Sequence, residues 1–518
     1  MKEIERIFLL TLTKRVVLFS SIAVIALLLI AYSPFTAKNE FKLTSNGKSI
    51  SSGDTEQLTI EDIDQTKTAY AISDSGNHQA TITITTREFP NGDAVVYIEG
   101  ASDGYLEPIH VELPATGEPA LDYTEDKTVP ELYPHRKERK LDDPLSTTLR
   151  YIENETNSVL VGTSAYFNDI SHSYEDGQVS RVIELQREAE SLKTGEEAWE
   201  IIVQFEPGEE NFSTWLMISD EALVNGEAEF QQVHKIATDE FRWVTPNTLW
   251  SHGLNAIFPR TDRAFVRSLV RQSGRASAVM LETAPSRIWE NINRAQFASL
   301  ETARNEDGLW HSDYTSTWLE RSYGIGPDYI DTRHNDNLFR AQLKRAEQLG
   351  YDAYAQERSV YADFLIEMTE AGYTIPQGPG YYLMDYFDME HDTHSSLNHA
   401  LSLMNYQYDA YLHLGDAKYL ESAEDQFAAL LHTGTGWVND ENTIIYQMRP
   451  DGTMSGKDYN LVTYYDLLYT KKLRNDLGLA SSETLDHLIK VKEQNLHDKG
   501  MAIEGTLENV EEFVGLIE

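Results

Sequence analysis

Hydrophobic and polar residues alternate along the first half of the chain, from about residue 41 to residue 244. The segments QATITITTREF, AVVYIEGAS and FSTWLMISDEALV show this two-residue period and contain many β-branched and aromatic residues. That pattern is typical of strands that bury one face. Turn-forming runs such as PNGD and EDGQ separate the segments. We therefore predict a β-sandwich-like region, built of one or two antiparallel sandwiches.

The period becomes helical from about Pro246 onward, and a repeat of helix, Leu-Gly and helix appears. The glycines of this repeat are Gly350, Gly415 and Gly478, which lie 65 and 63 residues apart. Glycine supplies the left-handed conformation that ends a helix, so we predict an αα-hairpin turning at each glycine. Such hairpins, joined by longer connectors, are typical of an α/α barrel or toroid.

The connectors between these hairpins should lie together at the barrel end opposite the glycines. They cover about residues 305–336, 371–396 and 433–460. Tyr386 lies in the second connector, and Tyr446 and Tyr459 lie in the third. We therefore expect these three tyrosines to converge on one rim. The alternative is that they are ordinary core or surface aromatics, because the chain has 28 tyrosines.

The charge and composition exclude some classes of function. The 518-residue chain has 43 basic and 84 acidic residues and a formal net charge of −41. This balance argues against nucleic-acid binding, because phosphate contact needs a basic surface. The chain contains no cysteine, so disulfides and thiolate metal sites are excluded. Its length exceeds what one hydrophobic core usually serves and favours more than one domain.

The N-terminal segment has the features of a membrane anchor. Basic residues precede an uncharged apolar run from Val16 to Tyr32, which is about the minimum length that spans a bilayer core. The basic residues place the N-terminus inside the cell and the remainder outside. A cleaved signal peptide is the alternative, although no A-x-A site follows the run.

Together these patterns predict an α+β multidomain protein, anchored in the cell membrane by one helix, with its other domains on the extracytoplasmic side. We expect a cytoplasmic tail and transmembrane anchor at residues 1–35. A β-rich region should follow at residues 36–244, and an α/α-barrel domain that carries the chemistry at residues 245–518.

Four motifs in the helical half together resemble the D-glucuronyl C5-epimerases. They are DYF from Asp385, LNHALSLMNYQYDAY from Leu397, IIYQMR from Ile444 and KDYNLVTYYDLL from Lys457. The resemblance covers roughly residues 380–475, and the plan of anchor, β-domain and α/α barrel agrees more weakly. It implies a uronyl C5-epimerase that acts on a uronic-acid-containing polysaccharide. It also implies that Tyr386, Tyr446 and Tyr459 are the catalytic tyrosines.

The sequence departs from this family at three points. Asn460 and Thr463 stand where the family has histidines that help to bind substrate. The interval of 13 residues between Tyr446 and Tyr459 is shorter than the family's. The segment DTRHNDNLF, from Asp331, stands where the family begins a helix with Gln-Gly-Gln. These departures concern the substrate more than the chemistry.

Epimerisation at C5 removes a proton next to a carboxylate and returns it on the opposite face of the sugar. The intermediate enediolate carries extra negative charge, so a cation must neutralise the carboxylate. Arg449, three residues beyond Tyr446, is the first candidate, and Arg333 and His334 are the next. Two tyrosines on opposite faces would serve in turn as acid and base. A positive neighbour must first lower the phenol pKa from about 10.

An aromatic connector supplies further candidates. Trp310 and Trp318 are suited to stacking against sugar rings, and Glu320 and Asp328 are acids that a hydrolase would place on either side of a glycosidic bond. Packing of this segment over the barrel end is the alternative. The predicted substrate-binding residues are Asp385, Asn398, Asn460, Arg333, His334, Trp310 and Trp318.

Four arginines recur at every fourth residue, which would align them on one helix face. They are Arg263, Arg267, Arg271 and Arg275. Such a face could hold a polyanion, or its members could form ordinary surface ion pairs. Separately, His391 and His394 lie beside three carboxylates, which permits a structural divalent cation, whereas a mobile polar loop is the simpler interpretation. We predict no catalytic metal and no cofactor.

Three classes of function therefore remain open. The first, favoured by the three tyrosines and Arg449, is a uronyl C5-epimerase. The second is a polysaccharide lyase or glycoside hydrolase on the same scaffold. The third is a catalytically silent glycan-binding surface protein. The expected partners are an acidic polysaccharide and the membrane, through the N-terminal helix, with no nucleic acid; a homodimer is left open.

Overall fold

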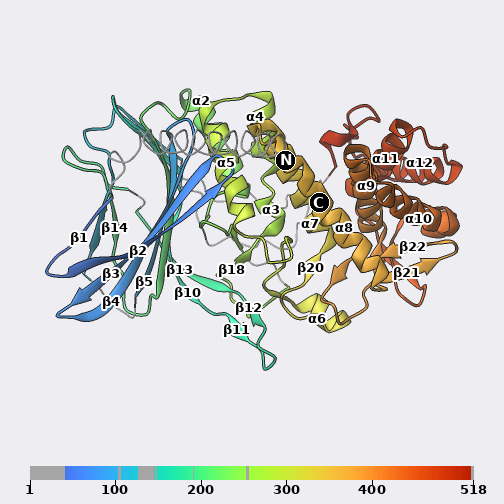
Figure 1. Ribbon diagram of the computed structural model, residues 1–518, viewed down its shortest axis with the longest axis horizontal. Coiled ribbons are helices and arrows are strands. Elements are labelled where there is room, and N and C mark those ends of the chain that lie inside the picture. Colours follow the sequence, from blue (N-terminus) through green and yellow to red (C-terminus); the bar gives the residue numbers. More distant parts are fainter. Residues whose placement is uncertain are drawn as a thin grey trace, which may run out of the picture.

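A β-rich part and a helical part lie side by side in the computed structural model, which describes residues 41–102, 107–125, 145, 149–190, 192–252 and 256–514 (Figure 1). Among the helices of these residues, none is both long and apolar enough to cross a membrane. The predicted anchor at residues 1–35 lies outside the described residues, so it stays a prediction.

One antiparallel sheet of twelve strands organises the β-rich part. Nine strands follow one another across the sheet, and three more extend from β15, which pairs with both β10 and β9 along the same edge. In order they are β16 (Trp250–His252), β18 (Ala264–Arg267), β13 (Ile183–Ala189), β10 (Ser164–Asp169), β15 (Asn211–Ser219), β5 (Ala94–Ser102), β4 (Asn77–Glu88), β3 (Ile63–Asp74) and β2 (Ser49–Ile60), with β9 (Ser158–Val161), β8 (Leu149–Glu153) and β7 (Leu121–Glu125) on the branch.

A second, three-stranded sheet covers one face of the large sheet. It consists of β1 (Lys42–Ser45), β6 (Ile109–Glu112) and β14 (Glu200–Val203). Val96 and Ile98 of β5 share a buried core with Val111 of β6 and Ile201 of β14. Two antiparallel sheets around one apolar core form a sandwich arrangement.

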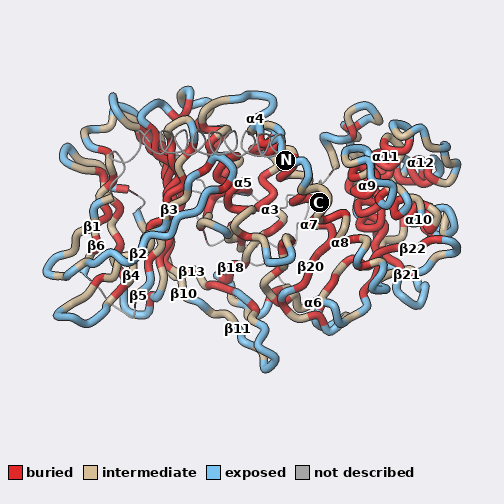
Figure 2. The backbone as a smooth tube through the Cα atoms, viewed as in Figure 1, coloured by how far each residue is buried: buried red, intermediate tan, exposed pale blue. Residues whose placement is uncertain are grey.

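The opposite face of the large sheet packs against helices α2 (Glu227–Glu240) and α5 (Arg287–Glu301). Val95 and Tyr97, which alternate with the residues facing the small sheet, share a second core with Ile292 and Phe297 of α5. Strand β5 is therefore buried on both faces, as its nearly continuous apolar sequence requires. Figure 2 shows buried positions on the large sheet and on α5 next to it.

A buried arginine fastens the large sheet to α5. The guanidinium of Arg87, in β4, donates to Ser299 Oγ (2.7 Å), Thr302 Oγ1 (3.0 Å) and the carbonyl of Pro246 (2.6 Å). Arg87 is fully buried, and burying a charge is costly unless hydrogen bonds replace its water. The junction between the two parts is thus both apolar and specifically hydrogen-bonded.

The helical part follows the predicted repeat. Gly350 and Gly415 cap the C-termini of α7 and α9 with φ angles of 81° and 75°, and Gly478 follows α11 with a φ of 66°. The predicted turns at these glycines are confirmed. Besides α5, the helices are α3 (Leu269–Gln272), α4 (Arg275–Thr283), α6 (Thr317–Tyr323), α7 (Thr332–Leu349), α8 (Arg358–Glu370), α9 (Leu397–Leu414), α10 (Ala417–Thr433), α11 (Leu461–Asp476) and α12 (Glu483–Asp498), with 3-10 turns η1 (Asp352–Glu357), η2 (Gly434–Trp437) and η3 (Val510–Glu512).

Helices α5, α7, α9 and α11 contact one another in sequence and form a row, and α8, α10 and α12 pack beside it. The central member is α9, in which every residue from Leu397 to Ala410 is buried. Such a helix is apolar or internally hydrogen-bonded on all sides, because neighbours surround it. Closure of this row into a complete barrel stays a prediction.

Short strands connect the longer elements. Strands and helices occur on both sides of residue 244, the predicted end of the β-rich region. Strands β16 and β18 of the large sheet follow this residue, and helix α2 precedes it. The short pairs are β11 (His172–Ser173) with β12 (Val179–Ser180), β17 (Ile257–Phe258) with β19 (Thr315–Ser316), β20 (Ile330–Asp331) with β23 (Tyr386–Phe387), β21 (Thr374–Gln377) with β22 (Gly380–Leu383), and β24 (Ser395–Ser396) with β25 (Ile445–Met448), which also pairs with β26 (Met454–Lys457).

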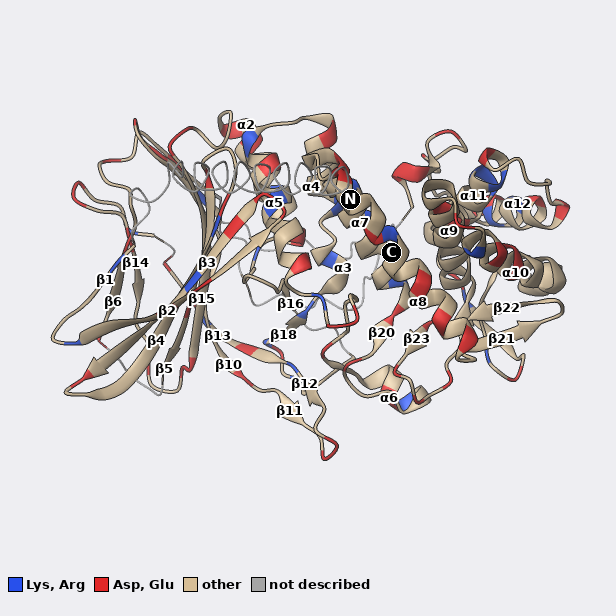
Figure 3. Ribbon diagram, in the orientation of Figure 1, with Lys and Arg blue, Asp and Glu red and all other residues tan. Residues whose placement is uncertain are grey.

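The predicted arginine face is wrong. Arg267 ends β18, Arg271 lies in the four-residue helix α3, and Arg275 begins α4, so the four arginines share no helix. Strand β18 pairs with β13 and β16, and this tertiary pairing overrides the four-residue spacing. Figure 3 shows charged residues of both signs dispersed over the two parts rather than gathered in a basic stripe.

We expect Gly415→Ala to destabilise the protein by about 1 kcal/mol and Gly415→Asn to cost less, because asparagine tolerates the left-handed conformation. A Cβ at this position would meet no atom within 4 Å, so backbone strain alone is tested. Urea unfolding followed by circular dichroism measures the effect. Gly436→Ala, at a glycine without a positive φ, is the control, and equal losses for Ala and Asn at position 415 would contradict the capping role.

Candidate active site

The three connectors meet at the end of the helical part where α7, α9 and α11 begin. Strand β20 of the first connector pairs with β23 of the second, with Asp331 opposite Tyr386. Strand β24 of the second connector pairs with β25 of the third, with Ser396 opposite Gln447. The repeat glycines cap the opposite ends of α7 and α9. The structure therefore brings the predicted tyrosines together at one end.

Tyr386 lies in a ring of aromatic side chains. Its ring centroid is 6.1 Å from Trp318, 6.0 Å from Tyr329, and 5.8 Å from both His394 and His399. The backbone of Tyr386 is fixed by pairing with β20 and by donation from its N–H to Thr393 Oγ1 (3.3 Å). Tyr386 as a whole residue is intermediate between buried and exposed.

Tyr446 joins the same cluster from the third connector. Its ring centroid is 5.8 Å from that of His394 and 5.7 Å from that of Tyr459. Tyr459 is 41% exposed and forms the outer edge. The His394 ring thus contacts both Tyr386 and Tyr446, which lie 60 residues apart in the sequence.

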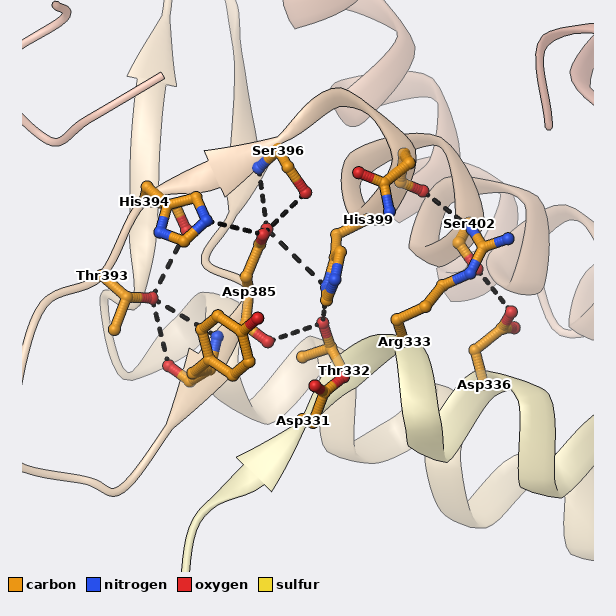
Figure 4. Close-up of polar contacts among 12 residues, drawn as sticks. Asp331, Thr332, Arg333, Asp336, Asp385, Thr393, His394, Ser396, His399 and Ser402 are labelled. Carbon is orange, nitrogen blue, oxygen red and sulfur yellow. Dashed lines mark hydrogen bonds and ion pairs between the residues drawn. The ribbon is translucent and has the colours of Figure 1, made fainter. Parts of the chain in front are cut away.

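Asp385 is a fully buried carboxylate at the base of the cluster (Figure 4). It accepts hydrogen bonds from Ser396 N (2.8 Å) and Ser396 Oγ (2.6 Å). His394 Nε2 lies 3.1 Å from Oδ2, and His399 Nδ1 lies 3.8 Å from Oδ1. The backbone carbonyl of Asp385 accepts from Thr332 N (3.1 Å) and Thr332 Oγ1 (2.9 Å). Asp385 therefore links the first and second connectors.

The electrostatics of the site favour an ionised Asp385 and neutral phenols. Burial opposes ionisation of Asp385, but His399, His394 and the hydrogen bonds of Ser396 outweigh it and hold the carboxyl pKa below its usual range. Burial, assisted by the charge of Asp331, raises the pKa of Tyr386 well above its usual value. Burial and the charge of Asp385 likewise raise the pKa of Tyr446. At neutral pH both phenols are proton donors.

Arg449 follows β25 and is exposed at the edge of the cluster. Its backbone N–H donates to the carbonyl of Thr453 (2.9 Å). Burial raises the pKa of the Tyr323 phenol, and the positive charge of Arg449 opposes this shift only in part. Arg449 is thus a cation close to the aromatic cluster and open to solvent.

The other predicted cations are placed differently. Arg333 is buried among the helices, where it donates to Asp466 Oδ2 (2.7 Å), Asp466 Oδ1 (3.2 Å) and the carbonyl of Asn398 (2.9 Å). These contacts engage its guanidinium in holding α7, α9 and α11 together. His334 lies in the first turn of α7, and its backbone N–H donates to the side chain of the capping residue Asp331 (2.9 Å).

The two predicted sugar-stacking tryptophans have opposite environments. Trp310 is fully buried, donates from Nε1 to the carbonyl of Leu300 (2.9 Å) and packs against Phe339. It belongs to the core. Trp318 is 41% exposed, and its ring centroid lies 5.8 Å from that of His394. Of the two, Trp318 is the one available to a ligand.

The remaining predicted residues flank the cluster. Asn398 is buried in the first turn of α9, and its Oδ1 has no hydrogen-bond partner among the described residues. Asn460 caps α11 and accepts from Lys499 Nζ (2.6 Å). Asp328 pairs with His311 (2.8 Å), and Glu320 is exposed on α6. Among the residues that the structure describes, no group of three or more histidines, cysteines or carboxylates could hold a metal ion.

Several residues of the cluster were not assigned a role from the sequence. The sequence pattern places His394 in a polar loop and indicates no role for Tyr323, His399 or Ser396. Their signal is weak because the contacts are long-range: Tyr323 and His394 are 71 residues apart. The pair of serines directly before the Leu-Asn start of α9 was the available hint, since serine is a common helix cap.

An apolar cavity of about 40 Å³ lies elsewhere, between the large sheet and α5. Tyr97, Trp215 and Ile292 are among its lining residues, and the lining includes none of the predicted site residues. It is therefore separate from the aromatic cluster.

No family model matches the chain, and no curated protein matches it. Solved structures with limited similarity include sugar epimerases and glycoside hydrolases. Cellobiose 2-epimerase from Bacillus thermoamylovorans B4167 is 12% identical, with 46% of this chain and 62% of that chain covered and a TM-score of 0.35. The family 76 glycoside hydrolase Bt3792, a mannosidase from Bacteroides thetaiotaomicron VPI-5482, is 12% identical, with 53% and 72% covered and a TM-score of 0.38.

A sugar epimerase from a ruminal bacterium is 9% identical, with 53% of this chain and 71% of that chain covered and a TM-score of 0.37. The match to cellobiose 2-epimerase spans less than two thirds of that enzyme. At these scores the likeness decides neither activity nor substrate, and the resemblance to glucuronyl C5-epimerases is not shown by it.

The buried histidine next to Asp385 should make stability depend on pH. Burial lowers the pKa of His399 below its usual value near 6.5. As pH falls below 6.5, the unfolded chain therefore binds a proton at this position before the folded protein does, and the free energy of unfolding decreases. We expect His399→Gln to remove part of this loss, by at most about 1.4 kcal/mol per pH unit.

Urea unfolding of the parent and the His399→Gln variant between pH 7.5 and 5 measures the difference. Asp466, whose pKa is raised to about 6, contributes stability that is lost as pH rises, but it is common to both proteins and cancels. His497→Gln, at an exposed histidine, is the control. Parallel stability curves for parent and His399→Gln would show that His399 is not held neutral.

Proposed function

We propose that the protein is a uronyl C5-epimerase, of glucuronyl type, that acts on a uronic-acid-containing polysaccharide. One observation carries this proposal: Tyr386 and Tyr446, from different connectors, both contact the ring of His394, with Tyr459 directly beside Tyr446. These are the tyrosines that the resemblance implies as catalytic. Their proximity supports proton transfer from more than one phenol to a single sugar ring.

The chemistry needs a proton donor, a proton acceptor and a positive charge. The raised pKa values of Tyr386 and Tyr446 suit them to donate a proton to the enediolate. Arg449 is the cation that we assign to the substrate carboxylate, since it is exposed beside the cluster. The N-terminal ends of α7 and α9, which begin at this site, add a partial positive charge.

Some of the predicted substrate-binding residues are placed to contact the substrate, and the others hold the site in position. We assign Trp318 to stacking against a sugar ring and Asn460 to hydrogen bonds with sugar hydroxyls, whereas Asn398 is buried and supports the site. Asp385 positions His394 and Ser396 and is too deeply buried to meet the substrate. His334 is retained as a neighbour of the site. Arg333 and Trp310 act through the core that supports it.

Features outside the site complete the proposal. We propose that residues 245–518 form the catalytic α/α barrel, that residues 36–244 support it, and that residues 1–35 anchor it to the membrane with the site on the extracytoplasmic side. A homodimer is a further proposal, whereas no structural cation is proposed for the 388–394 loop, because His391 pairs with Asp388 and His394 with Tyr323. The reaction as written uses no cofactor.

A polysaccharide lyase is the second candidate, because it begins with the same proton abstraction at C5. A protonated phenol such as Tyr446 is also what a lyase needs to protonate the leaving oxygen at C4. A glycoside hydrolase is less favoured: it needs two carboxylates beside the bond, and Asp328 is paired with His311.

A catalytically silent glycan-binding protein is the third candidate. At the positions of the family's histidines, Thr463 donates to Asp458 Oδ1 (2.7 Å) and Asn460 accepts from Lys499. These residues stabilise the start of α11 and supply no imidazole to a substrate.

Incubation with uronic-acid polymers in deuterated water tests the proposal. An epimerase incorporates deuterium at C5 without cleaving the chain, and a lyase produces the absorbance of an unsaturated uronate. We expect Tyr386→Phe and Tyr446→Phe each to lower the rate of inversion by about 10²–10⁴-fold, because each removes a general acid or base and keeps the aromatic packing. Tyr459→Phe is measured in the same series.

Tyr411→Phe is the matched control, since Tyr411 lies near the opposite end of α9. One single-tyrosine variant should still exchange the C5 proton while failing to invert the sugar, because the other face keeps its phenol. Phe at positions 386, 446 and 459 with inversion within a few-fold of the parent would refute the tyrosine mechanism and direct attention to Glu320 and Asp328.

We expect Arg449→Lys to lower kcat/KM by roughly tenfold or more, because a lysine cannot make the bidentate contact of a guanidinium with a carboxylate. Arg321→Lys is the control, since Arg321 is exposed on α6 and donates to the carbonyl of Thr317 in its own helix (2.8 Å). Equal kcat/KM values for the parent and Arg449→Lys would exclude Arg449 as the carboxylate ligand.

A further inference from the structure

Proton abstraction at C5 needs a base, and a neutral phenol is a poor one. Tyr323, Tyr386 and Tyr446 all have raised pKa values, and a bound uronate would add negative charge and favour the neutral phenols further. A tyrosine can act as a base here only if a neighbouring group takes its proton.

One phenol in the cluster has such a neighbour. Tyr323 Oη lies 2.7 Å from Nδ1 of His394, and the two rings stack with centroids 5.5 Å apart and an interplanar angle of 23°. Tyr323 is the last residue of α6 and is partly buried. Trp318, from the first turn of the same helix, contacts both rings. This packing holds the phenol and the imidazole in one geometry.

The position of Asp385 decides which nitrogen of His394 carries the proton. Nε2 lies 3.1 Å from Asp385 Oδ2, an ion-pair distance, although the direction of the N–H deviates from hydrogen-bond geometry. A carboxylate attracts a protonated nitrogen and repels a lone pair, so Nε2 carries the hydrogen. In the neutral ring Nδ1 then has the lone pair, and the hydroxyl of Tyr323 donates to it.

The other histidines of the site are engaged elsewhere. His399 Nδ1 faces the hydroxyl of Thr332 (2.8 Å), and His391 Nδ1 pairs with Asp388 (2.7 Å). Each has an acceptor or donor that is not a phenol of the cluster. Only His394, among the described histidines of this loop and of α9, has a ring nitrogen within hydrogen-bond distance of a tyrosine hydroxyl in the cluster.

We propose that Tyr323 is an additional catalytic tyrosine, the general base at C5, and that His394 accepts its proton while Asp385 orients the imidazole. This inference rests on the proposed epimerase function. The order phenol, imidazole and carboxylate has the logic of a Ser-His-Asp triad, in which the carboxylate fixes the tautomer of the base. Here the activated hydroxyl abstracts a proton instead of attacking a carbonyl.

The proton balance of one turnover is as follows. The O–H bond of Tyr323 breaks and its proton goes to His394 Nδ1. The tyrosinate takes the C5 proton, and the electron pair of the C–H bond passes into the enediolate, which Arg449 stabilises. Tyr446 or Tyr386 then donates its proton to C5 from the other face and becomes a tyrosinate. That tyrosinate recovers a proton from solvent, and His394 releases its extra proton to solvent.

Kinetics against pH provide the first test. Groups that bear on the titration of His394 are Tyr323 from α6, Tyr386 from β23, Tyr446 from β25, the neighbouring Asp385 and His399 from α9. Protonated His394 accepts no proton, so kcat/KM of the parent should fall on the acidic side of its pH profile.

We expect Tyr323→Phe and His394→Gln each to lower kcat/KM by about 10²–10⁴-fold. The double variant should lose no more than the single ones, because the two residues act as one unit. In His394→Gln the acidic limb of the pH profile should disappear from the residual activity. His391→Gln, in the same loop but outside the ring cluster, should stay within a few-fold of the parent with an unchanged profile.

Three kinetic results would overturn the proposal. They are full activity of Tyr323→Phe, an unchanged acidic limb in His394→Gln, and a loss in His391→Gln as large as that in His394→Gln.

A second test needs no turnover. Nitrogen-15 NMR of histidine-labelled protein at neutral pH should show His394, assigned through His394→Gln, as a neutral ring protonated on Nε2. Its Nδ1 resonance should shift in Tyr323→Phe. A cationic ring or a proton on Nδ1 would refute the relay. A parent protein that passes this test but exchanges no C5 proton would refute the epimerase function, while the donation of Tyr323 to His394 stands.

Discussion

A single buried charge, the carboxylate of Asp385, holds the candidate site together. Removing a carboxylate from water is costly unless charged or hydrogen-bonding partners replace the solvent, and here Ser396, His394 and His399 do so. Tyr386 is the next residue, and Ser396 lies in β24, which pairs with the strand that carries Tyr446. The same contacts therefore fix the backbone at both tyrosines. The geometry of the aromatic cluster therefore depends on the hydrogen bonds and ion pairs that the buried carboxylate of Asp385 requires.

The parts of the fold that could be predicted are those with a local cause. A glycine that needs a positive φ ends its helix wherever that helix packs, so Gly350 and Gly415 fixed the hairpins and, with them, the end at which the connectors meet. The proximity of Tyr386 and Tyr446 follows from that topology. Alternation in β5 likewise indicated a strand, although it did not reveal that both faces are covered.

What the sequence did not reveal depends on contacts between distant segments. Arg333 is a residue type that could bind a substrate carboxylate. Its guanidinium is instead hydrogen-bonded to Asp466, which lies 133 residues away in the sequence. Trp310 is a residue type that could stack against a sugar ring. In the structure it packs against Phe339 and donates to the carbonyl of Leu300, inside the core. The spacing of Arg267 and Arg271 is helical, yet strand pairing to β16 overrides it. In each case a residue's type was clear and its partner was not.

Helix α5 has a consequence for how such a protein can change over evolution. Its buried residues run along most of its length, with Ile292 and Phe297 packed into the core shared with the large sheet and Arg294 bonded to Asp62 near the end of β2. Both parts present apolar surface at this junction. Recombination that exchanged the sheet or the helices alone would expose that apolar face to solvent, so we expect the two to be inherited together.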